Sequence, residues 1–157
     1  MKREAFRIEP LAEAEREDAV RLLVAQLREH GIDTPEEAVR GAIDGALAVP
    51  SRGRLLMVRD GDEVIGVAYV SFVWALEHGG QAAWLEELYV VPERRCDGVG
   101  TALLHAAFGI ARLEGCVAID LEVEASRDRV TSLYRREGFT AHSRTRWVKS
   151  LRPPREE

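Results

Sequence analysis

The sequence predicts an α/β fold, with a mixed central sheet that carries helices on both faces. Strand-like apolar runs occur at four places, 55–58, 64–73, 83–91 and 117–124. Amphipathic helical periodicity occurs at 13–30 and 99–113. The strand–turn–helix–strand unit over 84–124 favours this class most strongly, because such a unit normally makes a right-handed crossover between parallel strands.

The N-terminal half predicts one strand, two helices and a hairpin. Residues 6–8 alternate apolar and charged side chains, which is typical of a short strand. A helix over 13–30 ends at Gly31, and a second helix follows and ends at Pro50. The Asp60-Gly61 turn then joins the first two apolar runs into a hairpin.

The C-terminal half predicts strands and helices in alternation. Residues 117–124 alternate apolar and acidic side chains over most of their length, which indicates a strand. A last helix is expected at 128–137, followed by one or two final strands over 139–148. The complete sheet then has six to seven strands.

Length, charge and cysteine content narrow the class of protein. A chain of 157 residues predicts a single domain over 1–151, with a frayed tail at 152–157. The net charge of −5 argues against nucleic acid as the partner. Cys96 and Cys116 have neither metal-ligand spacing nor a disulfide framework, so we expect no metal and a cytoplasmic location. No apolar run reaches the roughly 18–20 residues that span a bilayer, so we expect no membrane association.

One turn, Arg95-Cys96-Asp97-Gly98-Val99-Gly100-Thr101, leads from a predicted strand into a predicted helix. A helix N-terminus leaves backbone N–H groups without partners and is partly positive, so it can hold a phosphate. Gly98 and Gly100 would let the backbone approach a ligand without an intervening Cβ. By itself this pattern predicts either an anion site or a plain tight helix entry.

Several motifs between residues 84 and 140 follow one another in a fixed order. Leu88-Tyr89-Val90-Val91-Pro92 leads into Arg95-x-x-Gly98-x-Gly100. Leu121-Glu122-Val123 comes next, and Leu133-Tyr134 with Glu137-Gly138-Phe139 completes the series. With these motifs the chain resembles the GCN5-related N-acetyltransferases (GNAT). The resemblance implies the GNAT fold, in which the fourth and fifth strands splay apart, and acetyl-CoA as cosubstrate.

The same resemblance implies a cofactor site. Backbone amides from Arg95 to Thr101 would hold the CoA pyrophosphate, and Val90 and Val91 would pair with the pantetheine arm as an added strand does. A backbone N–H between Leu88 and Val90 would polarise the thioester carbonyl. The cofactor-binding residues expected in this way are Val90, Val91, Arg95, Cys96, Asp97, Gly98, Val99, Gly100 and Thr101.

The resemblance also gives Tyr134 a role. Tyr134 resembles the family tyrosine that lies near the CoA sulfur and could protonate the departing thiolate. The alternative is a helix residue that packs on the core.

The chain departs from the family pattern at two positions. Cys96 stands where glycine is frequent, and its Cβ is tolerable if its φ is negative. Arg127 stands where many members carry an asparagine that contacts the cofactor. That contact is therefore not carried over, and Arg127 either meets a CoA phosphate or lies on the surface.

Three carboxylates are candidates for the general base that deprotonates the acceptor amine, namely Glu86, Glu87 and Glu122. Strict strand alternation would point Glu86 and Glu87 to opposite faces. The family pattern of Glu before Leu-Tyr-Val favours Glu87. Glu122 corresponds to the base of some relatives, but a solvated acidic strand face explains it equally well, and a water relay is a further alternative.

The acceptor side is predicted from the connection between the third and fourth strands and from the second helix, over residues 40–47. The aromatic and charged residues around that connection are Trp74, Glu77, His78 and Trp84. They suit a cationic amine, whereas the two tryptophans are equally compatible with a core or dimer contact. Edge strands invite pairing and many relatives are dimers, so we expect a homodimer.

The sequence therefore predicts an acetyl-CoA-dependent N-acetyltransferase that transfers acetyl directly to an amine. The acceptor would be a small molecule, such as an amino acid, polyamine or aminoglycoside, or a protein amine. The alternative is a non-catalytic acyl-CoA-binding sensor or interaction module on the same fold. A dinucleotide-binding module fits poorly, because the glycine spacing is not Gly-x-Gly-x-x-Gly.

Overall fold

The computed structural model of the chain describes residues 6–124 and 128–154. The chain divides into two compact units, Met1–Glu122 and Val123–Glu157. Each unit is described by itself.

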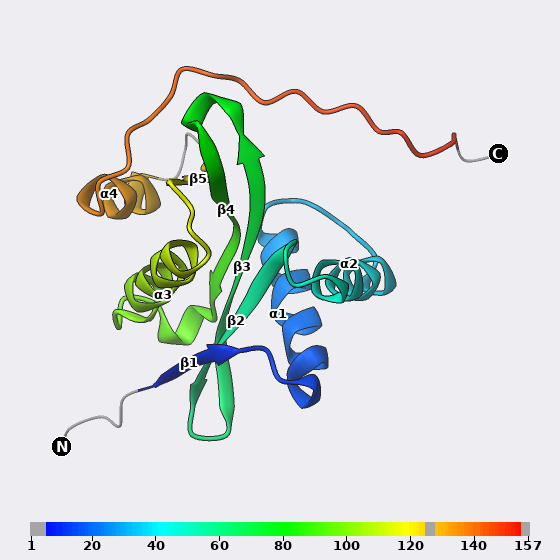
Figure 1. Cartoon of the computed structure of the whole chain (residues 1–157). Helices are drawn as coiled ribbons and strands as arrows, with labels where there is room; N and C mark the ends of the chain where they lie inside the picture. Colours follow the sequence, from blue (N-terminus) through cyan, green and yellow to red (C-terminus); the bar gives the residue numbers. More distant parts are fainter. Residues whose placement is uncertain (1–5, 125–127, 155–157) are drawn as a thin grey trace. The chain divides into compact units, whose positions relative to one another are not determined.

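The first unit carries the sheet and three of the helices (Figure 1). Its strands are β1 (Arg7–Pro10), β2 (Gly53–Asp60), β3 (Glu63–Ala75), β4 (Gly80–Val90) and β5 (Ala118–Leu121). Its helices are α1 (Arg16–Glu29), α2 (Glu36–Ala48) and α3 (Val99–Leu113), with 3₁₀ turns at Glu13–Glu15, Leu76–His78 and Pro92–Arg94.

The sheet has the order β1-β2-β3-β4-β5. All neighbours are antiparallel except β4 and β5, which are parallel, so the predicted parallel arrangement of the strands at the two ends of 84–124 is confirmed. The parallel pairing runs from Ala82–Ala118 to Leu85–Leu121. Strand β4 continues beyond it to Val90, and this last part has no strand paired on the β5 side among the described residues.

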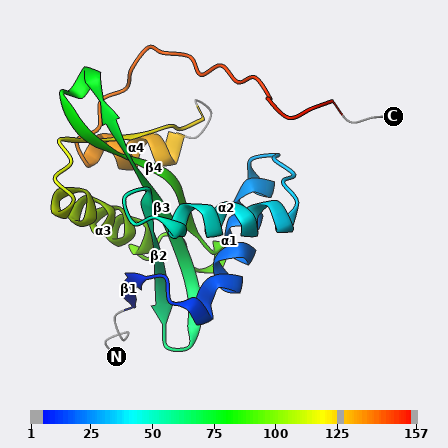
Figure 2. The ribbon, with the colours of Figure 1, turned by 45° about the vertical axis from the view of Figure 1, so that its right-hand side comes forward.

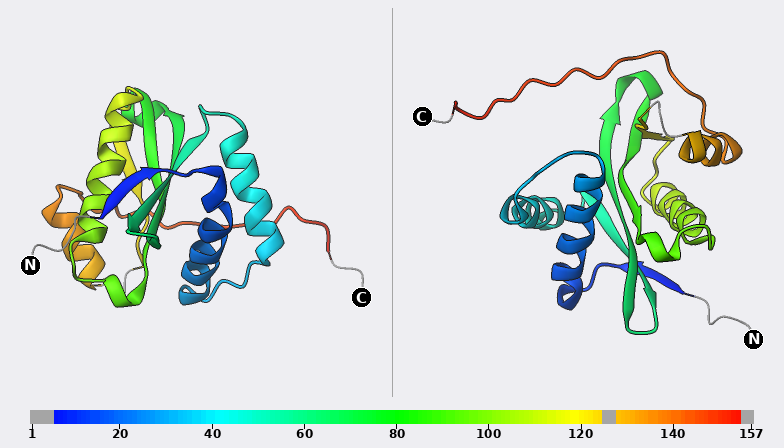
Figure 3. Two further views of the ribbon diagram at one scale, coloured as in Figure 1. Left: turned by 90° about the horizontal axis from the view of Figure 1, so that it is seen from below. Right: turned by 180° about the vertical axis from the view of Figure 1, so that it is seen from behind.

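Helices cover both faces of the sheet in this unit (Figures 1 and 3). Helices α1 and α2 pack on one face, around a core that includes Val20, Ile43 and Met57. Helix α3 contacts β2, β3 and β4 on the opposite face and buries Leu103 and Ala107. Figure 2 shows β2, β3 and β4 running between these two layers.

A β-bulge interrupts β4 at Glu86. Tyr69 of β3 pairs with Glu87, whereas its neighbour Val70 pairs with Leu85. Glu86 is therefore the extra residue that faces no partner on β3. Beyond this point the side chains and the backbone polar groups of β4 change phase relative to the first half of the strand.

The second unit contains α4 (Asp128–Arg136), which confirms the predicted last helix. Gly138, with φ of +91°, ends it, and the Phe139 N–H donates to the Tyr134 carbonyl at 3.0 Å. The rings of Tyr134 and Phe139 meet edge to face, with centroids 5.5 Å apart. The chain then runs on without helix or strand as far as residue 154 (Figure 1).

The prediction of final strands over 139–148 is therefore wrong for this structure, and the sheet has five strands within residues 6–124 and 128–154 rather than six to seven. The physical reason is that a strand requires a neighbouring strand for its backbone N–H and C=O groups. Side-chain alternation in a sequence carries no information on whether that neighbour is present.

No helix in the described part of the chain is long and apolar enough to cross a membrane.

Candidate active site

The glycine turn supplies an open helix N-terminus. Helix α3 begins at Val99, and Gly98, its N-cap, has a φ of +81° that favours glycine. Gly98 has no side chain to cap the helix, and the first turn of α3 contains no acidic residue. A Cβ added at Gly98 would meet no heavy atom within 4 Å, and one added at Gly100 would lie 4.0 Å from Val90. The turn therefore has room for an anion beside its N–H groups.

Cys96 adopts the left-handed conformation, with φ of 66°. The condition of a negative φ, under which its Cβ would be tolerable, is therefore not met, and the residue carries the strain that glycine would avoid. The thiol is exposed and makes no disulfide. Glycine is frequent at this position in the family pattern, and the positive φ of the turn explains why, because glycine adopts it without strain.

The side chain of Arg95 contacts α1 and β4 next to the turn. Its Nε donates to the Val90 carbonyl at 2.9 Å, and a terminal nitrogen contacts Glu29, at the end of α1, at 2.8 Å. The guanidinium also lies over the Tyr89 ring, 5.3 Å from its centroid. The side chain of Arg95 therefore links α1 to the end of β4, and only its backbone belongs to the glycine turn.

Beyond the bulge, alternate residues of β4 direct their backbone to opposite edges. The Val91 N–H donates to Ile65 of β3, and the Val91 carbonyl accepts from the Arg94 N–H, so both groups are used within the protein. By alternation the N–H and C=O groups of Leu88 and Val90 point away from β3, to the edge of β4 that β5 pairs with only as far as Leu85. The predicted backbone contact of the pantetheine arm is thus available at Val90 but not at Val91.

Gln26 of α1 is a site residue that the sequence reasoning missed. It is buried, and its Nε2 donates to the Leu88 carbonyl at 3.1 Å. Its Oε1 is buried without a hydrogen-bond partner. Because Gln26 occupies the Leu88 carbonyl, the Leu88 N–H remains as the donor that this residue presents at the open edge. The available signal was a polar residue on the buried stripe of an amphipathic helix.

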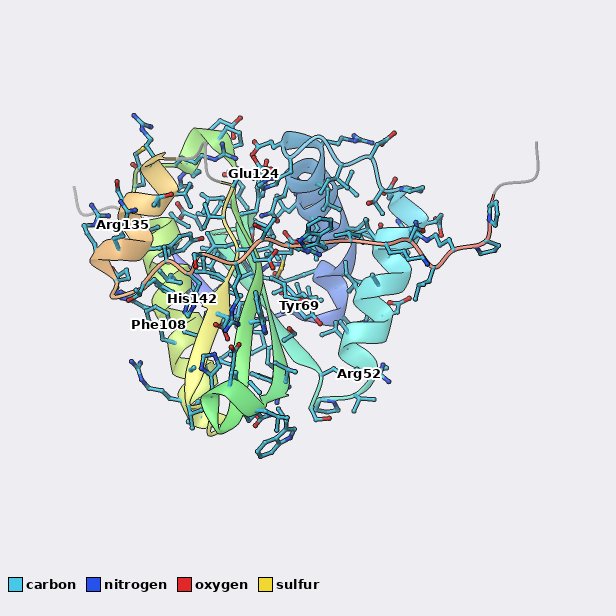
Figure 4. The ribbon with its side chains drawn as sticks, turned by 90° about the horizontal axis from the view of Figure 1, so that it is seen from above. Arg52, Tyr69, Phe108, Glu124, Arg135 and His142 are labelled. Carbon is cyan, nitrogen blue, oxygen red and sulfur yellow. The ribbon has the colours of Figure 1, made fainter. Side chains whose placement is uncertain are left out.

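Glu87 lies on the face that α1 and α2 cover, next to the open edge. Burial raises the pKa of Glu87, the charge of His30 lowers it, and the charge of Glu86 raises it. The charge of Glu86 also contributes to the raised pKa of Tyr69, whose main cause is burial. Strict alternation does not hold at Glu86 and Glu87, because Glu86 is the extra residue of the bulge. Figure 4 shows Tyr69 on the side of α1 and α2, and Phe108 on α3 on the other side.

The remaining predicted catalytic residues lie elsewhere in the chain. Glu122 is exposed directly after the end of β5. Tyr134 belongs to α4 of the second unit, where burial raises the pKa of its phenol. The phenol therefore remains protonated at neutral pH and can donate a proton. Arg127 lies outside the described residues.

The residues predicted for the acceptor side gather at the start of β4. Trp74 is exposed and pairs with Gln81, which lies about 20 Å along the strand from Glu87 at about 3.3 Å per residue. His78 contacts Asp120 of β5 at 2.9 Å, and Glu77 is in the same 3₁₀ turn. Trp84 alone of this set is close to the bulge along the chain. The structure therefore separates most of these residues from Glu87.

Comparison with known proteins agrees with this geometry. The model of the acetyltransferase (GNAT) family matches residues 16–139, which include the glycine turn, the open edge of β4 and Tyr134. The chain belongs to the GNAT family. Membership identifies the matched region as an acyltransferase domain with acetyl-CoA as its cosubstrate.

The curated relatives are named as acetyltransferases of several different acceptors. The chain is 36% identical over 112 residues to a mycothiol acetyltransferase of Clavibacter michiganensis, covering 67% of this chain but only 34% of that protein. It is 35% identical over 106 residues to aminoglycoside N(6')-acetyltransferase type 1 of Klebsiella aerogenes, covering 66% of this chain and 69% of that one. It is 29% identical over 140 residues to an aminoalkylphosphonate N-acetyltransferase of Salmonella typhimurium, covering 89% and 88%.

Solved structures share the fold of this GNAT chain. The aminoglycoside N-acetyltransferase AAC(6')-Iy in complex with CoA superposes with a TM-score of 0.82 at 17% identity, covering 96% of this chain and 99% of that one. A predicted acetyltransferase of Clostridium acetobutylicum with acetyl-CoA superposes with a TM-score of 0.78 at 15% identity, covering 92% and 96%. At these identities the likeness concerns the fold.

Replacement of Cys96 by glycine tests the strain in the turn. We expect Cys96→Gly to raise the free energy of unfolding by about 1 kcal/mol, because glycine adopts positive φ without penalty. Chemical denaturation of both proteins measures the difference. Cys96→Ser removes the thiol but keeps the Cβ, and it should give no gain. An equal gain in both variants would trace the effect to the thiol instead.

Proposed function

We propose that this chain is an acetyl-CoA-dependent N-acetyltransferase that transfers acetyl directly to an amine. The observation that carries the proposal is the open edge of β4 beyond the bulge, directly before the glycine turn. Such an edge offers backbone N–H donors to the carbonyl oxygens of an extended pantetheine arm. The turn that follows offers N–H groups to the pyrophosphate at the end of that arm.

The cofactor is held by backbone groups in this proposal. The N–H groups from Arg95 to Thr101 receive the pyrophosphate, and Gly98 and Gly100 keep the approach clear of side chains. Val90 pairs with the pantetheine arm. The Leu88 N–H faces the thioester carbonyl and stabilises the negative charge that develops on its oxygen during attack. Gln26 supports this role by occupying the Leu88 carbonyl.

Glu87 is the proposed general base. Attack on the thioester requires a neutral amine, so the ammonium of the acceptor must first lose a proton. The raised pKa of Glu87 makes it a better proton acceptor than an ordinary carboxylate. Glu122 remains the second candidate for the same step, because the family resemblance matches it to the base of some relatives.

Tyr134 is the proposed general acid, on the strength of its place in the family motif. When the tetrahedral intermediate collapses, the C–S bond breaks and the CoA thiolate takes a proton. A phenol whose pKa burial has raised supplies that proton and is then restored from solvent.

The acceptor is proposed to be a small cationic amine. The curated relatives are named for an aminoglycoside, an aminoalkylphosphonate and mycothiol, which favours a small molecule over a protein amine. Helices α1 and α2 form the wall that would meet it, because Glu87 lies on the face that they cover. The rival function, an acyl-CoA sensor, would need the cofactor site alone, without Glu87 or Tyr134.

Blocking the turn tests the placement of the pyrophosphate. We expect Gly100→Trp to weaken acetyl-CoA binding on the order of 100-fold, because the indole excludes at least one charge-assisted hydrogen bond. Gly98→Trp should do the same and also lose stability, because φ is +81° there. Calorimetric titration measures the affinity. Gly109→Trp, in the same helix and with open space around it, is the control and should bind normally. Normal binding by Gly100→Trp would refute the placement.

The pH dependence of turnover tests Glu87. In the native protein kcat/KM should rise with pH through the raised pKa of Glu87, so its acid limb lies above the ordinary value of 4.5. Glu87→Gln should remove this limb and lower kcat about 100-fold. Glu86→Gln, the neighbouring exposed carboxylate, is the control, with a small effect on rate. An unchanged acid limb in Glu87→Gln would assign the base elsewhere.

The same shift predicts an opposite effect of Glu87→Gln on stability. Folding raises the pKa of Glu87, so ionisation of this carboxylate costs stability as the pH rises above its unfolded pKa. Glu87→Gln should therefore unfold at higher denaturant than the native protein at neutral pH. The difference should shrink below the unfolded pKa, where both side chains are neutral.

Release of free CoA against a panel of amines tests the enzyme against the sensor. We expect turnover with at least one small amine, and a kcat lowered about 100-fold in Tyr134→Phe with the acetyl-CoA affinity unchanged. Tyr89→Phe removes another buried phenol and should turn over normally. Tight acetyl-CoA binding without turnover of any amine would favour the sensor.

A further inference from the structure

Polar and aromatic side chains form two neighbouring rows across β2, β3 and β4, on the face that α1 and α2 cover. In the first row, Glu87 of β4 lies opposite Tyr69 of β3. In the second row, Ser71 of β3 lies between Trp84 of β4 and Gly53 of β2. Residues directly opposite in antiparallel strands project to one face, with Cβ atoms about 5 Å apart. Tyr69 packs on the core beneath α1 and α2, and Ser71 follows it by two residues, so both rows belong to that face.

Arg52 places a positive charge at the β2 end of these rows. It directly precedes Gly53, and its Nη1 donates to the Gly45 carbonyl of α2 at 2.7 Å. The Tyr69 ring lies against Gly53, because a Cβ built on that glycine would be 2.8 Å from the Cε2 of the ring. The phenol oxygen, which is bonded to the neighbouring ring carbon, is therefore close to the start of β2. Figure 4 shows Arg52 and Tyr69 on the side of α2.

Carboxylates lie at the other end of the rows, at the bulge of β4. The charges of His30 and Glu86 both act on Glu87, and they oppose each other. Burial and the charge of Glu86 raise the pKa of Tyr69, whereas the charge of Arg52 lowers it, so an acidic and a basic group both act on this phenol. The face is therefore acidic at β4 and basic at the start of β2, with Tyr69 between the two.

Several polar groups of this face have no partner within the described part of the chain. The Glu87 carboxylate and the hydroxyl groups of Tyr69 and Ser71 make no hydrogen bond to another described residue. Arg52 forms no ion pair there, and the Gly45 carbonyl accepts from only one of its N–H groups. A few convergent polar groups beside aromatic rings are typical of a site for a small molecule.

We propose that the acceptor is a small zwitterion, an amine that carries an anionic oxygen group a few bonds away. This inference rests on the proposed acetyl transfer and specifies its acceptor. The ammonium binds at Glu87, beside the ring of Trp84, whose face attracts cations. The anionic group binds the planar guanidinium of Arg52, which suits carboxylate and phosphonate alike, and the hydroxyl groups of Tyr69 and Ser71 donate to it. Charges held at both ends direct the nitrogen to the proposed base.

Two matched amines test whether the anionic group is recognised. β-Alanine and β-alaninamide have the same length and both carry an ammonium, but only β-alanine has a carboxylate. Each is titrated calorimetrically into the native protein saturated with CoA, and aminoethylphosphonate is titrated in parallel. We expect at least one zwitterion to bind about 10-fold more tightly than the amide, and the tighter one identifies the anionic group. If neither binds more tightly than the amide, the proposal is wrong.

Replacement of Arg52 tests the position of the anionic group. Arg52→Gln should weaken binding of the preferred zwitterion about 10-fold and leave the amide unaffected, because only the zwitterion loses a charged partner. Arg52→Lys keeps the charge and should retain part of the preference. Arg7→Gln, which replaces an exposed arginine of β1, is the control and should change neither affinity.

The pattern of loss in Arg52→Gln separates the site from a structural role. An equal loss for zwitterion and amide would mean that Arg52 acts only through its contact with α2, and would overturn the proposal. Calorimetry with CoA detects binding without turnover. A wrong acceptor class is therefore distinguished from a failure of acetyl transfer itself, which the release of free CoA reports.

Discussion

One extra residue in β4 sets the geometry on which the candidate site depends. Without the bulge at Glu86, the period of two would continue unbroken from the half of β4 that pairs with β5. The Leu88 and Val90 backbone groups would then point to β3, and Glu87 would turn away from α1. The bulge reverses both, so that outward N–H donors and a half-buried carboxylate occur at neighbouring residues.

The two halves of β4 consequently serve different purposes. Before the bulge, the backbone groups on the outer edge of β4 pair with β5. After it, the carbonyls of Leu88 and Val90 are taken by the side chains of Gln26 and Arg95, while their N–H groups remain directed outward. Side chains that occupy the acceptors and leave the donors give this stretch of strand a positive electrostatic character. That character suits a thioester oxygen in the act of gaining charge.

Local sequence patterns predicted most helices and strands well, but they did not predict the irregularities within and between them. The helix over 99–113 matches α3 at both ends, because apolar periodicity and the glycines around it are local signals. The bulge has no such signal, since Glu86 and Glu87 look alike in sequence and only pairing with β3 distinguishes them. The positive φ of Cys96 likewise depends on how the turn closes. The segment over 139–148 alternates as strands do, yet pairing requires a neighbour that alternation cannot supply.

Helix α2 is attached to the sheet by few residues, and this has an evolutionary consequence. Its buried residues are Val39 and Ile43, and much of the rest of the helix faces outward. Mutations along α2 therefore cost little folding energy, whereas mutations in β4 or the glycine turn would alter the proposed cofactor site. Selection can reshape the proposed acceptor wall while the acyl-donor machinery is conserved. A single scaffold can in this way be diversified toward many amines by drift in one helix.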